Sequence, residues 1–543
     1  MRAPCDAVLQ PAADLIPCRA EAKPWILAAT ILASSMAFID STVVNVALPA
    51  IQADFRTNVT GVQWVVESYG VLLAALILAG GSLGDMLGRR KIFLVGVVIF
   101  AVASLACGLA QSIQQLIVAR SVQGVGAALL VPGSLAIISA SFDVQTRGQA
   151  IGTWSGFTAI TTAIGPVLGG WLVEHASWRW AFFINLPVAT AVIVISMLYI
   201  SETRRSTAGR IDWPGALLVT LALGRIVSGF IESIGLGWRH PLVYGSLILG
   251  FGFLIVFLAF EARTVSPMVP LELFASPSFS GANLLTLFLY AAIGIFFFLF
   301  PLNLIQIQRY SATAAGAAVL PLILLMFTLS RWSGGLVARY GARGPLIFGP
   351  IIAALGFVLF AVPSIGGSYW TTFLPAVVVL GVGMATTVAP LTTVVMNSAS
   401  QDLAGAASGI NNAVARVAGV LAIAVLGIVM ANAFSSRLNH KLAELSLPPD
   451  ILQEIHANES KLGGLQLSAS VKSSTREQIR RMVAEAFVYG FRLVMLISAC
   501  LSVASAVIAW RLIPAGTSSL IAEHRRPQHR NKMHRPADAQ HQG

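Results

Sequence analysis

Residues 152–171 read GTWSGFTAITTAIGPVLGGW, and none of these twenty residues carries a charged side chain. A stretch of this length and character can cross a lipid bilayer as one helix. It contains two glycine pairs with a spacing of four, Gly152 with Gly156 and Gly165 with Gly169. This spacing lets two helix backbones touch inside lipid, so the stretch predicts a tightly packed membrane helix.

A proline follows one of these glycines. Pro166 lies directly after Gly165 and shortly before the adjacent glycines Gly169 and Gly170. Because proline removes a backbone hydrogen bond inside a helix, the helix can bend at this point. An ordinary packing helix would have the same composition, and the sequence of the stretch alone leaves that alternative open.

The composition of the whole chain also indicates a membrane protein. Of the 543 residues, 56% are hydrophobic and 11% are charged, and the mean hydropathy is +0.79. Soluble domains carry about 25% charged residues. The net charge of +12 would suggest nucleic-acid binding in a soluble protein, but here the positive residues lie in short loops between apolar blocks. We therefore expect no nucleic-acid partner, and we find no pattern that predicts a metal site, a cofactor or ATP binding.

Apolar blocks of about 20 residues recur along the chain and give fourteen predicted transmembrane spans. Clusters of Lys and Arg follow the even-numbered spans, which places both termini in the cytoplasm by the positive-inside rule. The spans are residues 25–47, 62–83, 92–110, 115–139, 149–173, 180–200, 213–231, 241–261, 279–301, 312–332, 345–363, 371–395, 406–430 and 484–512.

An internal repeat divides these spans into two halves. Residues 81–90, GSLGDMLGRR, are similar to residues 334–343, GGLVARYGAR. The copies end spans two and ten, whereas a six-helix repeat would separate them by six spans, so two central spans are extra. Two parallel halves of this kind can rock about a site near the middle of the membrane.

The chain is therefore predicted to be an all-α polytopic membrane protein with five regions. These are a cytoplasmic tail (1–24), a six-helix bundle (25–200), two additional helices (213–261), a second six-helix bundle (279–512) that includes an outer loop (431–483), and a basic cytoplasmic tail (513–543).

Four segments, in order along the chain, resemble signatures of the major facilitator superfamily, and more closely its fourteen-helix drug:proton antiporters of the EmrB/QacA type. They are FIDSTVVNVALP (38–49), GSLGDMLGRRK (81–91), LIVARSVQGVGAA (116–128) and APLTTVVMNSASQDLAGAASGINNAVARVAG (389–419). The glycine-proline stretch is similar to the antiporter motif in the fifth helix of this superfamily, at Gly156, Gly165, Pro166, Gly169 and Gly170. One departure is Ala338, which replaces the acid in the second copy of the repeat.

The resemblance implies proton-coupled efflux of lipophilic, cationic drugs or toxic compounds across a bacterial inner membrane, by alternating access. A dedicated exporter of one metabolite, lipid or self-made toxin is an alternative. A transporter-like receptor is an alternative of another class. The expected partners are a small-molecule substrate, protons and the lipid bilayer, together with a periplasmic adaptor and an outer-membrane channel if the exporter uses them.

Ionisable residues within the spans indicate where protons are coupled, because a charge in lipid costs at least about 2.5 kcal/mol. Asp40, Glu67 and Arg120 each lie about five to seven residues from the outer end of their span, and therefore at similar depth. Two carboxyl groups near one arginine form a set whose protonation can follow access to water. Alternatively, Arg120 only tethers the first span and Glu67 faces the outer interface.

The first copy of the repeat predicts a gating latch at the cytoplasmic ends of spans two and three. Asp85, Arg89 and Arg90 supply its charges, and Gly84 and Gly88 allow a tight turn. The arginines also serve as a plain topology signal.

Polar and aromatic residues within the spans are candidates for a large, mainly apolar substrate pocket. Aromatic faces suit flat lipophilic cations. Arg416 has an interhelical hydrogen-bond clamp as its alternative role, and Arg225 and Glu232 could pair on one helix face. The pocket candidates are Trp64, Tyr69, Trp154, Asn303, Asn411 and Arg416.

Overall fold

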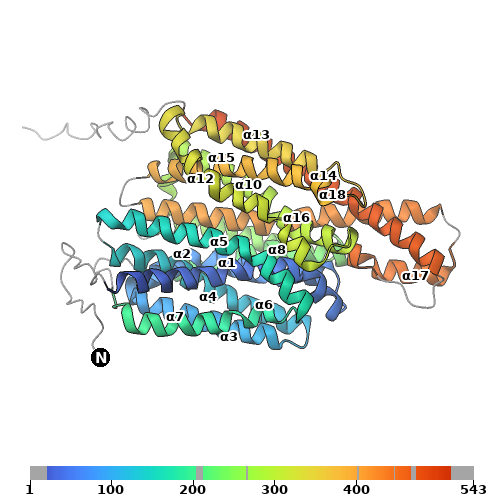
Figure 1. The fold of residues 1–543 in the computed structure, drawn as a ribbon, viewed down its shortest axis with the longest axis horizontal. Coiled ribbons are helices and arrows are strands. Elements are labelled where there is room, and N and C mark those ends of the chain that lie inside the picture. The colour runs from blue at the N-terminus through green and yellow to red at the C-terminus, as the bar shows by residue number, and fades with distance from the viewer. Residues whose placement is uncertain are drawn as a thin grey trace, which may run out of the picture.

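The fold is a bundle of long helices that run along the longest axis of the molecule (Figure 1). The structure is a computed structural model, and the part of the chain that it describes contains helices and loops but no strand. It describes residues 21–142, 144–203, 212–264, 267–399, 403–444, 447–465 and 473–514.

The first half of the chain forms one bundle. Its helices are α1 (Lys23–Asp54), α2 (Val59–Leu87), α3 (Arg89–Leu109), α4 (Ile113–Ser141), α5 (Val144–His175), α6 (Trp180–Phe183) and α7 (Asn185–Tyr199). Side chains cap the ends where the sequence allows: Asn58 accepts from the backbone N–H of Gly61 at 3.0 Å, and Ser112 accepts from that of Gln115 at 3.3 Å. The helix α5 is continuous through Pro166.

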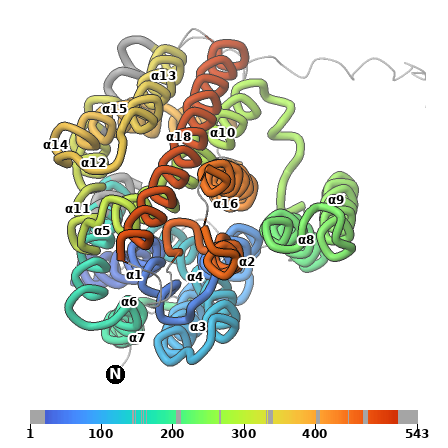
Figure 2. The backbone as a smooth tube through the Cα atoms, turned by 90° about the vertical axis from the view of Figure 1, so that its right-hand side faces the viewer, coloured from blue at the N-terminus to red at the C-terminus, as the bar shows by residue number. Residues whose placement is uncertain are grey.

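The second half forms another bundle. Its elements are α10 (Pro277–Leu302), η2 (Asn303–Ile307), α11 (Ala312–Ala317), α12 (Leu320–Tyr340), α13 (Arg343–Phe360), α14 (Tyr369–Thr372), α15 (Leu374–Asn397), α16 (Ala404–Ala443), α17 (Pro449–Asn458), η3 (Glu459–Gly464) and α18 (Ser473–Leu512). Between the halves come α8 (Trp213–Leu236), α9 (Pro241–Glu261) and η1 (Leu271–Ala275). Figure 2 shows α8 and α9 at the side of the molecule, with α9 farther out.

Thirteen helices in the described part of the chain are long and apolar enough to cross a membrane. The helix α5 is not among them, but its 32 residues contain the uncharged stretch 152–171. The protein is therefore a multi-pass helical membrane protein. The count of fourteen spans stays a prediction.

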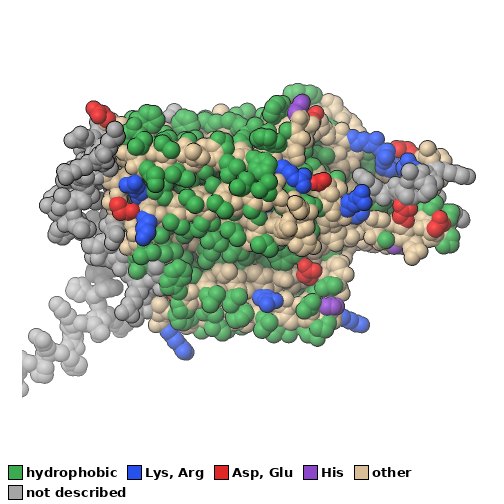
Figure 3. Space-filling model, turned by 90° about the horizontal axis from the view of Figure 1, so that it is seen from below, with side chains coloured by type: hydrophobic (Ala, Val, Ile, Leu, Met, Phe, Trp, Pro, Cys, Tyr) green, Lys and Arg blue, Asp and Glu red, His purple; other side chains and the backbone are tan. Residues whose placement is uncertain are grey.

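The surface is consistent with a lipid environment. Hydrophobic side chains cover the middle of the molecule, and charged ones gather mainly toward its two ends (Figure 3). On α9, Leu242, Ile248 and Ile255 are each about two-thirds exposed, as expected for side chains that face lipid.

The two copies of the internal repeat share a backbone feature. Gly88 has φ +115° and Gly341 has φ +75°, and each lies between two consecutive helices. Side chains other than glycine rarely adopt these angles. The aligned glycines therefore make equivalent turns in the two halves.

Most of the described residues in the predicted outer loop 431–483 are helical, so the helices continue beyond the predicted spans. Helix α16 continues to Ala443, α18 begins at Ser473, and both are 40 residues long. Together with α17 they form a helical hairpin that projects from one end of the molecule (Figure 1). We call this the hairpin end.

Packing between its helices explains why the polar hairpin is helical. Leu438 and Leu442 of α16 are buried, as are Ile455 of α17 and Ile479 of α18. Lys441 of α16 also forms an ion pair with Glu485 of α18. The apolar part of the sequence ends at about residue 430, but these contacts allow the helix α16 to continue to Ala443.

Candidate functional site

The centre of the first bundle contains a buried ion pair between α1 and α4. Arg120 donates a hydrogen bond from Nη1 to Oδ2 of Asp40. The side chains of Arg120 and Asp40 are 1% and 0% exposed. The Nε of Arg120 also donates to the carbonyl oxygen of Val65, at 3.1 Å, which ties α2 to the same point. The prediction that Asp40 and Arg120 lie together is confirmed.

Three further polar residues complete this cluster. Gln123 donates from Nε2 to Oδ1 of Asp40 at 2.8 Å and to Oγ of Ser104 at 2.7 Å. Asn185 donates to the same two oxygens, at 3.5 and 3.2 Å. The Asp40 carboxylate therefore meets side chains from α4 and α7, and Ser104 of α3 supports them. We call Asp40, Arg120, Gln123, Ser104 and Asn185 the Asp40 cluster.

Sequence reasoning missed Gln123, Ser104 and Asn185. A signal was present, since Gln123 lies three residues after Arg120 and therefore on the same helix face. Ser104 and Asn185 were visible only as polar residues in apolar blocks.

Tyr69 links the Asp40 cluster to the second bundle. The guanidinium carbon of Arg120 lies 4.3 Å from the centre of the Tyr69 ring, and the Tyr69 hydroxyl donates to the carbonyl oxygen of Ala37 at 3.4 Å. Arg416 of α16 interacts electrostatically with Tyr69. Of the predicted pocket residues, Tyr69 and Arg416 therefore approach each other across the two halves.

Glu67 does not join the Asp40 cluster in this conformation. Val65 and Tyr69 face Arg120, and residue 67 lies between them on the opposite side of α2. Its carboxyl group is fully buried, and neither oxygen has a hydrogen-bond partner among the described residues. The predicted set of three therefore holds for Asp40 and Arg120 only.

The helix face that carries Glu67 meets α16. Gln63, four residues earlier, donates to the carbonyl oxygen of Ile423 at 3.2 Å. Gly70, three residues later, packs so that an added Cβ would lie 2.9 Å from Val420. Residues 63, 67 and 70 share one face of a helix, so Glu67 lies at the contact between the two bundles.

The glycine stretch of α5 makes two kinds of close contact. A Cβ added at Gly165 would lie 2.0 Å from Oγ1 of Thr42, so this glycine packs against α1 in the same bundle. Gly169 packs similarly, against Val43 of α1. By contrast, an added Cβ at Gly152 would meet nothing within 4 Å, which corrects the prediction of close packing there. The surroundings of Gly156 lie outside the described part of the chain.

The same stretch touches the second bundle backbone to backbone. A Cβ added at Gly170 would lie 2.2 Å from the carbonyl oxygen of Ala312, and one added at Gly316 would lie 2.0 Å from that of Pro166. We call this contact between residues 166–174 and 311–316 the α5–α11 seam.

A hydrogen-bonded carboxylate closes the α5–α11 seam toward the hairpin end. Glu174 accepts from the hydroxyl of Thr313 at 2.6 Å and from its backbone N–H at 3.3 Å. Because these bonds favour the charged form, they hold the pKa of Glu174 below its ordinary value of 4.5.

The predicted latch residues contact only their own bundle in the described part of the structure. Arg89 pairs with Asp85 at 2.8 Å and donates to the carbonyl oxygen of Ala136 on α4, at 3.5 Å. Arg90 donates to the carbonyl oxygen of Met197 on α7, at 3.3 Å. Latching of the two halves through Asp85, Arg89 and Arg90 stays a prediction.

The turn that carries the latch is fixed by a residue that the sequence did not indicate. Glu202 accepts from the backbone N–H groups of Arg90 and Lys91, at 3.2 and 3.0 Å, and so caps the start of α3. The backbone N–H of Gly88 donates to the carbonyl oxygen of Gly84 at 3.1 Å, which closes the end of α2.

Two of the predicted pocket residues contact other helices. Trp64 donates to Oε1 of Glu232 on α8 at 2.9 Å, so Glu232 binds α2 and does not pair with Arg225. Trp154 donates to Oγ of Ser34 on α1 at 3.1 Å.

The other two belong to the second bundle. Asn411 donates to Oδ1 of Asn283 and Oγ1 of Thr286 on α10, at 3.2 and 2.8 Å. Asn303 is buried at the start of the π-helical segment η2. With Tyr69 and Arg416, these residues are distributed over several helix contacts.

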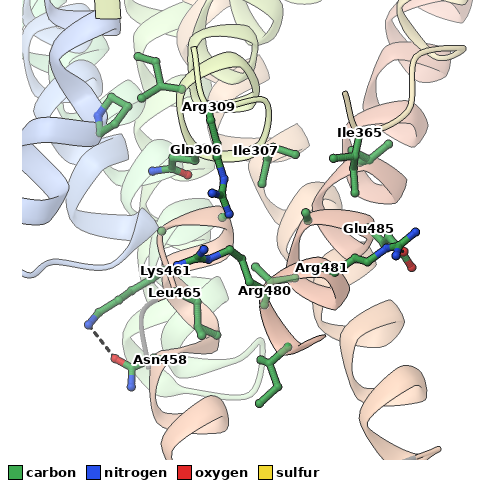
Figure 4. Close-up of a pocket in the computed structure, with 18 of the residues that line it drawn as sticks. Gln306, Ile307, Arg309, Ile365, Asn458, Lys461, Leu465, Arg480, Arg481 and Glu485 are labelled. Carbon is green, nitrogen blue, oxygen red and sulfur yellow. Dashed lines mark hydrogen bonds and ion pairs between the residues drawn. The ribbon is translucent and has the colours of Figure 1, made fainter. Parts of the chain in front are cut away.

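Two cavities are found elsewhere, and none of the six pocket candidates lines either. One, of about 550 Å³, is an apolar cleft between α1, α5 and α7, and Asn185 of the Asp40 cluster reaches its wall. The other, of about 1470 Å³, lies at the hairpin end and is lined by many arginines (Figure 4).

The part of the chain that the structure describes is thus a multi-pass helical protein with a buried ion pair and with glycine contacts between two bundles, and the family that its sequence matches consists of transporters and not of enzymes. The chain belongs to the Major Facilitator Superfamily, whose family profile matches residues 30–423.

Several curated relatives are similar over most of their length. The chain is 32% identical to the multidrug resistance protein Stp of Mycobacterium tuberculosis over 497 residues, which cover 90% of this chain and 91% of that protein. It is 32% identical to the tetracenomycin C resistance and export protein of Streptomyces glaucescens over 493 residues, with the same coverage. It is 34% identical to the puromycin resistance protein pur8 of Streptomyces alboniger, over 76% of this chain and 83% of that protein.

Solved transporters share the fold. A bacterial homologue of the human lysosomal transporter Spinster, in an inward-facing and unoccupied conformation, matches with a TM-score of 0.63 and 15% identity, over 91% of this chain and 98% of that chain. The xylose transporter XylE of E. coli, in an inward-open conformation, matches with a TM-score of 0.55 and 13% identity, over 92% and 99%. At these identities the likeness concerns the fold alone.

Proposed function

We propose that the protein exports lipophilic, cationic drugs or toxic compounds across the inner membrane, driven by protons that enter in exchange. The observation that carries this proposal is the buried Asp40–Arg120 pair with its three polar partners. The names of the relatives, which refer to multidrug resistance and to export of an antibiotic, support the same activity.

The Asp40 carboxylate has the features of a proton-coupling group. In this conformation its charge is balanced by Arg120, and its oxygens accept hydrogen bonds from Gln123 and Asn185. A movement that separated Asp40 from Arg120 or admitted water would change that balance and the protonation of Asp40 with it. Proton binding could in this way be tied to the conformation of the first bundle.

Glu67 offers a second proton site at a different place. A lone buried carboxyl group is less costly with its proton than without it. Since Glu67 lies at the α2–α16 contact, separation of the bundles would hydrate it and allow the proton to leave. The carboxyl groups of Asp40 and Glu67 would then respond to different movements of the same cycle.

In the proposed orientation both termini lie in the cytoplasm and the hairpin end faces the outside. A substrate would meet α2, α5 and α16 between the bundles, with Tyr69 supplying an aromatic face. Export of a single compound is a second candidate, which the relatives named for resistance to one antibiotic favour.

Transport by purified protein in lipid vesicles tests the proposal. We expect a lipophilic cationic dye to accumulate against its gradient only when a proton gradient of the correct direction is imposed. The Glu67→Gln variant should bind dye but transport it slowly. Accumulation that is unaffected by an uncoupler would contradict proton coupling.

A further inference from the structure

The large cavity at the hairpin end has a strongly positive wall. Eight Lys and Arg residues and three Glu residues line it, so positive charges exceed negative ones by five. The lining comes mainly from α1, η2, α16, α17, η3 and α18, and therefore from both halves of the protein. The basic residues are Arg56, Arg309, Arg437, Lys461, Arg476, Arg480, Arg481 and Arg492.

Several of these charges have no carboxylate beside them. In the described part of the chain, Arg56, Arg437 and Arg492 form no ion pair: Arg437 lies over the ring of Tyr489 at 5.6 Å, and Arg492 donates to the carbonyl oxygens of Val362 and Pro363. These contacts position the guanidinium groups without neutralising them.

Arg309 and Arg480 point toward one another across the cavity (Figure 4). Glu477 lies between them, at 4.0 Å from Arg309 and 3.0 Å from Arg480, and it is the one carboxylate that both arginines share in the described ion pairs. Glu477 offsets one of these two charges, which leaves the pair with a net charge of +1. The N–H groups that Glu477 does not occupy can together contact a bound anion. Arg481 points away and is engaged by Glu485 at 3.4 Å, so it offers a matched control (Figure 4).

Backbone strain is concentrated at the same place. Among described residues other than glycine, only Arg56, Arg309 and Leu462 have positive φ, at 50°, 60° and 52°. Arg56 and Arg309 line the cavity, and Leu462 lies between the lining residues Lys461 and Gly463. The π-helical segment η2 ends two residues before Arg309. Such strained conformations are found where a structure holds side chains in place for a function.

We propose that this cavity binds a phosphate-bearing anion, held mainly by Arg309 and Arg480. The ligand is either the head group of an anionic phospholipid or a soluble phosphate. The site is separate from the Asp40 cluster, and the inference does not depend on the substrate or the direction of transport.

Two measurements on the purified full-length protein distinguish these sources. In neutral detergent, sodium phosphate should raise the midpoint of thermal unfolding more than sodium chloride of equal ionic strength. After passage through vesicles of equal parts phosphatidylglycerol and phosphatidylcholine, the protein should retain phosphatidylglycerol selectively. A response to phosphate alone indicates a soluble anion, retention of lipid alone indicates a head group, and either supports the site.

Substitutions of the lining arginines test whether this cavity causes the response to phosphate or the retention of phosphatidylglycerol. Arg309→Gln and Arg480→Gln should each weaken the response by about fivefold, the upper range for an exposed charged contact. Arg481→Gln removes the same charge and should leave the response unchanged, and unfolding midpoints without added anion show that all variants are folded. Absence of both responses in the wild-type protein, or equal weakening by Arg481→Gln, would overturn the proposal.

Discussion

Asp40 and Arg120 form an ion pair that is shielded from solvent on both sides, although 80 residues separate them in the chain. A buried pair is poor evidence for stability, because desolvation offsets much of its attraction. We propose instead that the charge of this pair changes during the transport cycle. Its hydrogen bonds involve four helices, α1, α2, α4 and α7. A movement of these helices relative to one another would therefore change the surroundings of the pair.

Replacing the acid of this pair should uncouple transport. In Asp40→Asn, Arg120 keeps its charge without the matching carboxylate, and we expect uphill dye transport in vesicles to fall to the level of protein-free vesicles. Asp54→Asn is the matched control, because Asp54 is also on α1 and pairs with Arg179 but is 45% exposed. Wild-type uphill transport by Asp40→Asn would show that Asp40 is not the coupling acid.

The glycine contacts of α5 predict a sharp difference between two identical substitutions. Gly165→Val forces a side chain against Thr42 of α1, and we expect dye efflux to fall at least about tenfold while dye binding is retained. Gly152→Val adds the same bulk where an added Cβ meets nothing within 4 Å, and efflux should be nearly unchanged. Equal effects of the two variants at equal expression would mean that the close packing at Gly165 is unimportant.

The α5–α11 seam should respond to acid only at low pH. The bonds from Thr313 lower the pKa of Glu174, so they stabilise the joined seam above about pH 4.5 and are lost as the pH falls through the lowered pKa. With spin labels at Ala176, close to Glu174, and at Ala314, next to Thr313, the short-distance population should be constant from pH 8 to pH 5.5 and decline only below the ordinary pKa of 4.5. Thr313→Val should reduce that population already at pH 7, and a wild-type transition near neutrality would identify another titrating group.

The proposed orientation predicts which cysteines react in whole cells. Asp450 lies on α17 at the hairpin end, and Asp450→Cys should react with an impermeant thiol reagent added to intact cells. Lys91→Cys, near the opposite end of the bundle, should react only after the membrane is permeabilised. The reverse labelling pattern would show that the protein has the opposite orientation in the membrane. Reaction of both cysteines in intact cells would contradict the predicted arrangement of spans.

The sequence predicted features that depend on position along a single helix. Counting residues in the apolar spans predicts the similar depth of Asp40 and Arg120, and the repeat aligns Gly88 with Gly341, both of which have positive φ. The same reasoning could have placed Glu67 correctly. Residues 65 and 69 lie on one face of a helix, and residue 67 lies on the other.

Features that depend on contacts between distant helices were not predictable. Asn185 meets Asp40 only because α7 packs on α1, and Glu202 reaches the start of α3 only because α7 ends beside it. The hairpin was missed because hydropathy detects lipid-facing helices, whereas Leu438 and Ile479 are buried by other helices outside the apolar span.

The α5–α11 seam has a consequence for the speed of the cycle. At Gly170 and Gly316 the two halves meet through bare backbone, so at these two glycines no side chain has to move when they part, and the hydrogen bonds of Glu174 to Thr313 are side-chain contacts of the seam that must break. Because nothing projects from either surface at these glycines, their contact should add little to the energy barrier for separation. A methyl group added at either glycine would clash with the opposite backbone and slow the cycle. We therefore expect these two glycines to set the turnover rate without altering what the protein recognises.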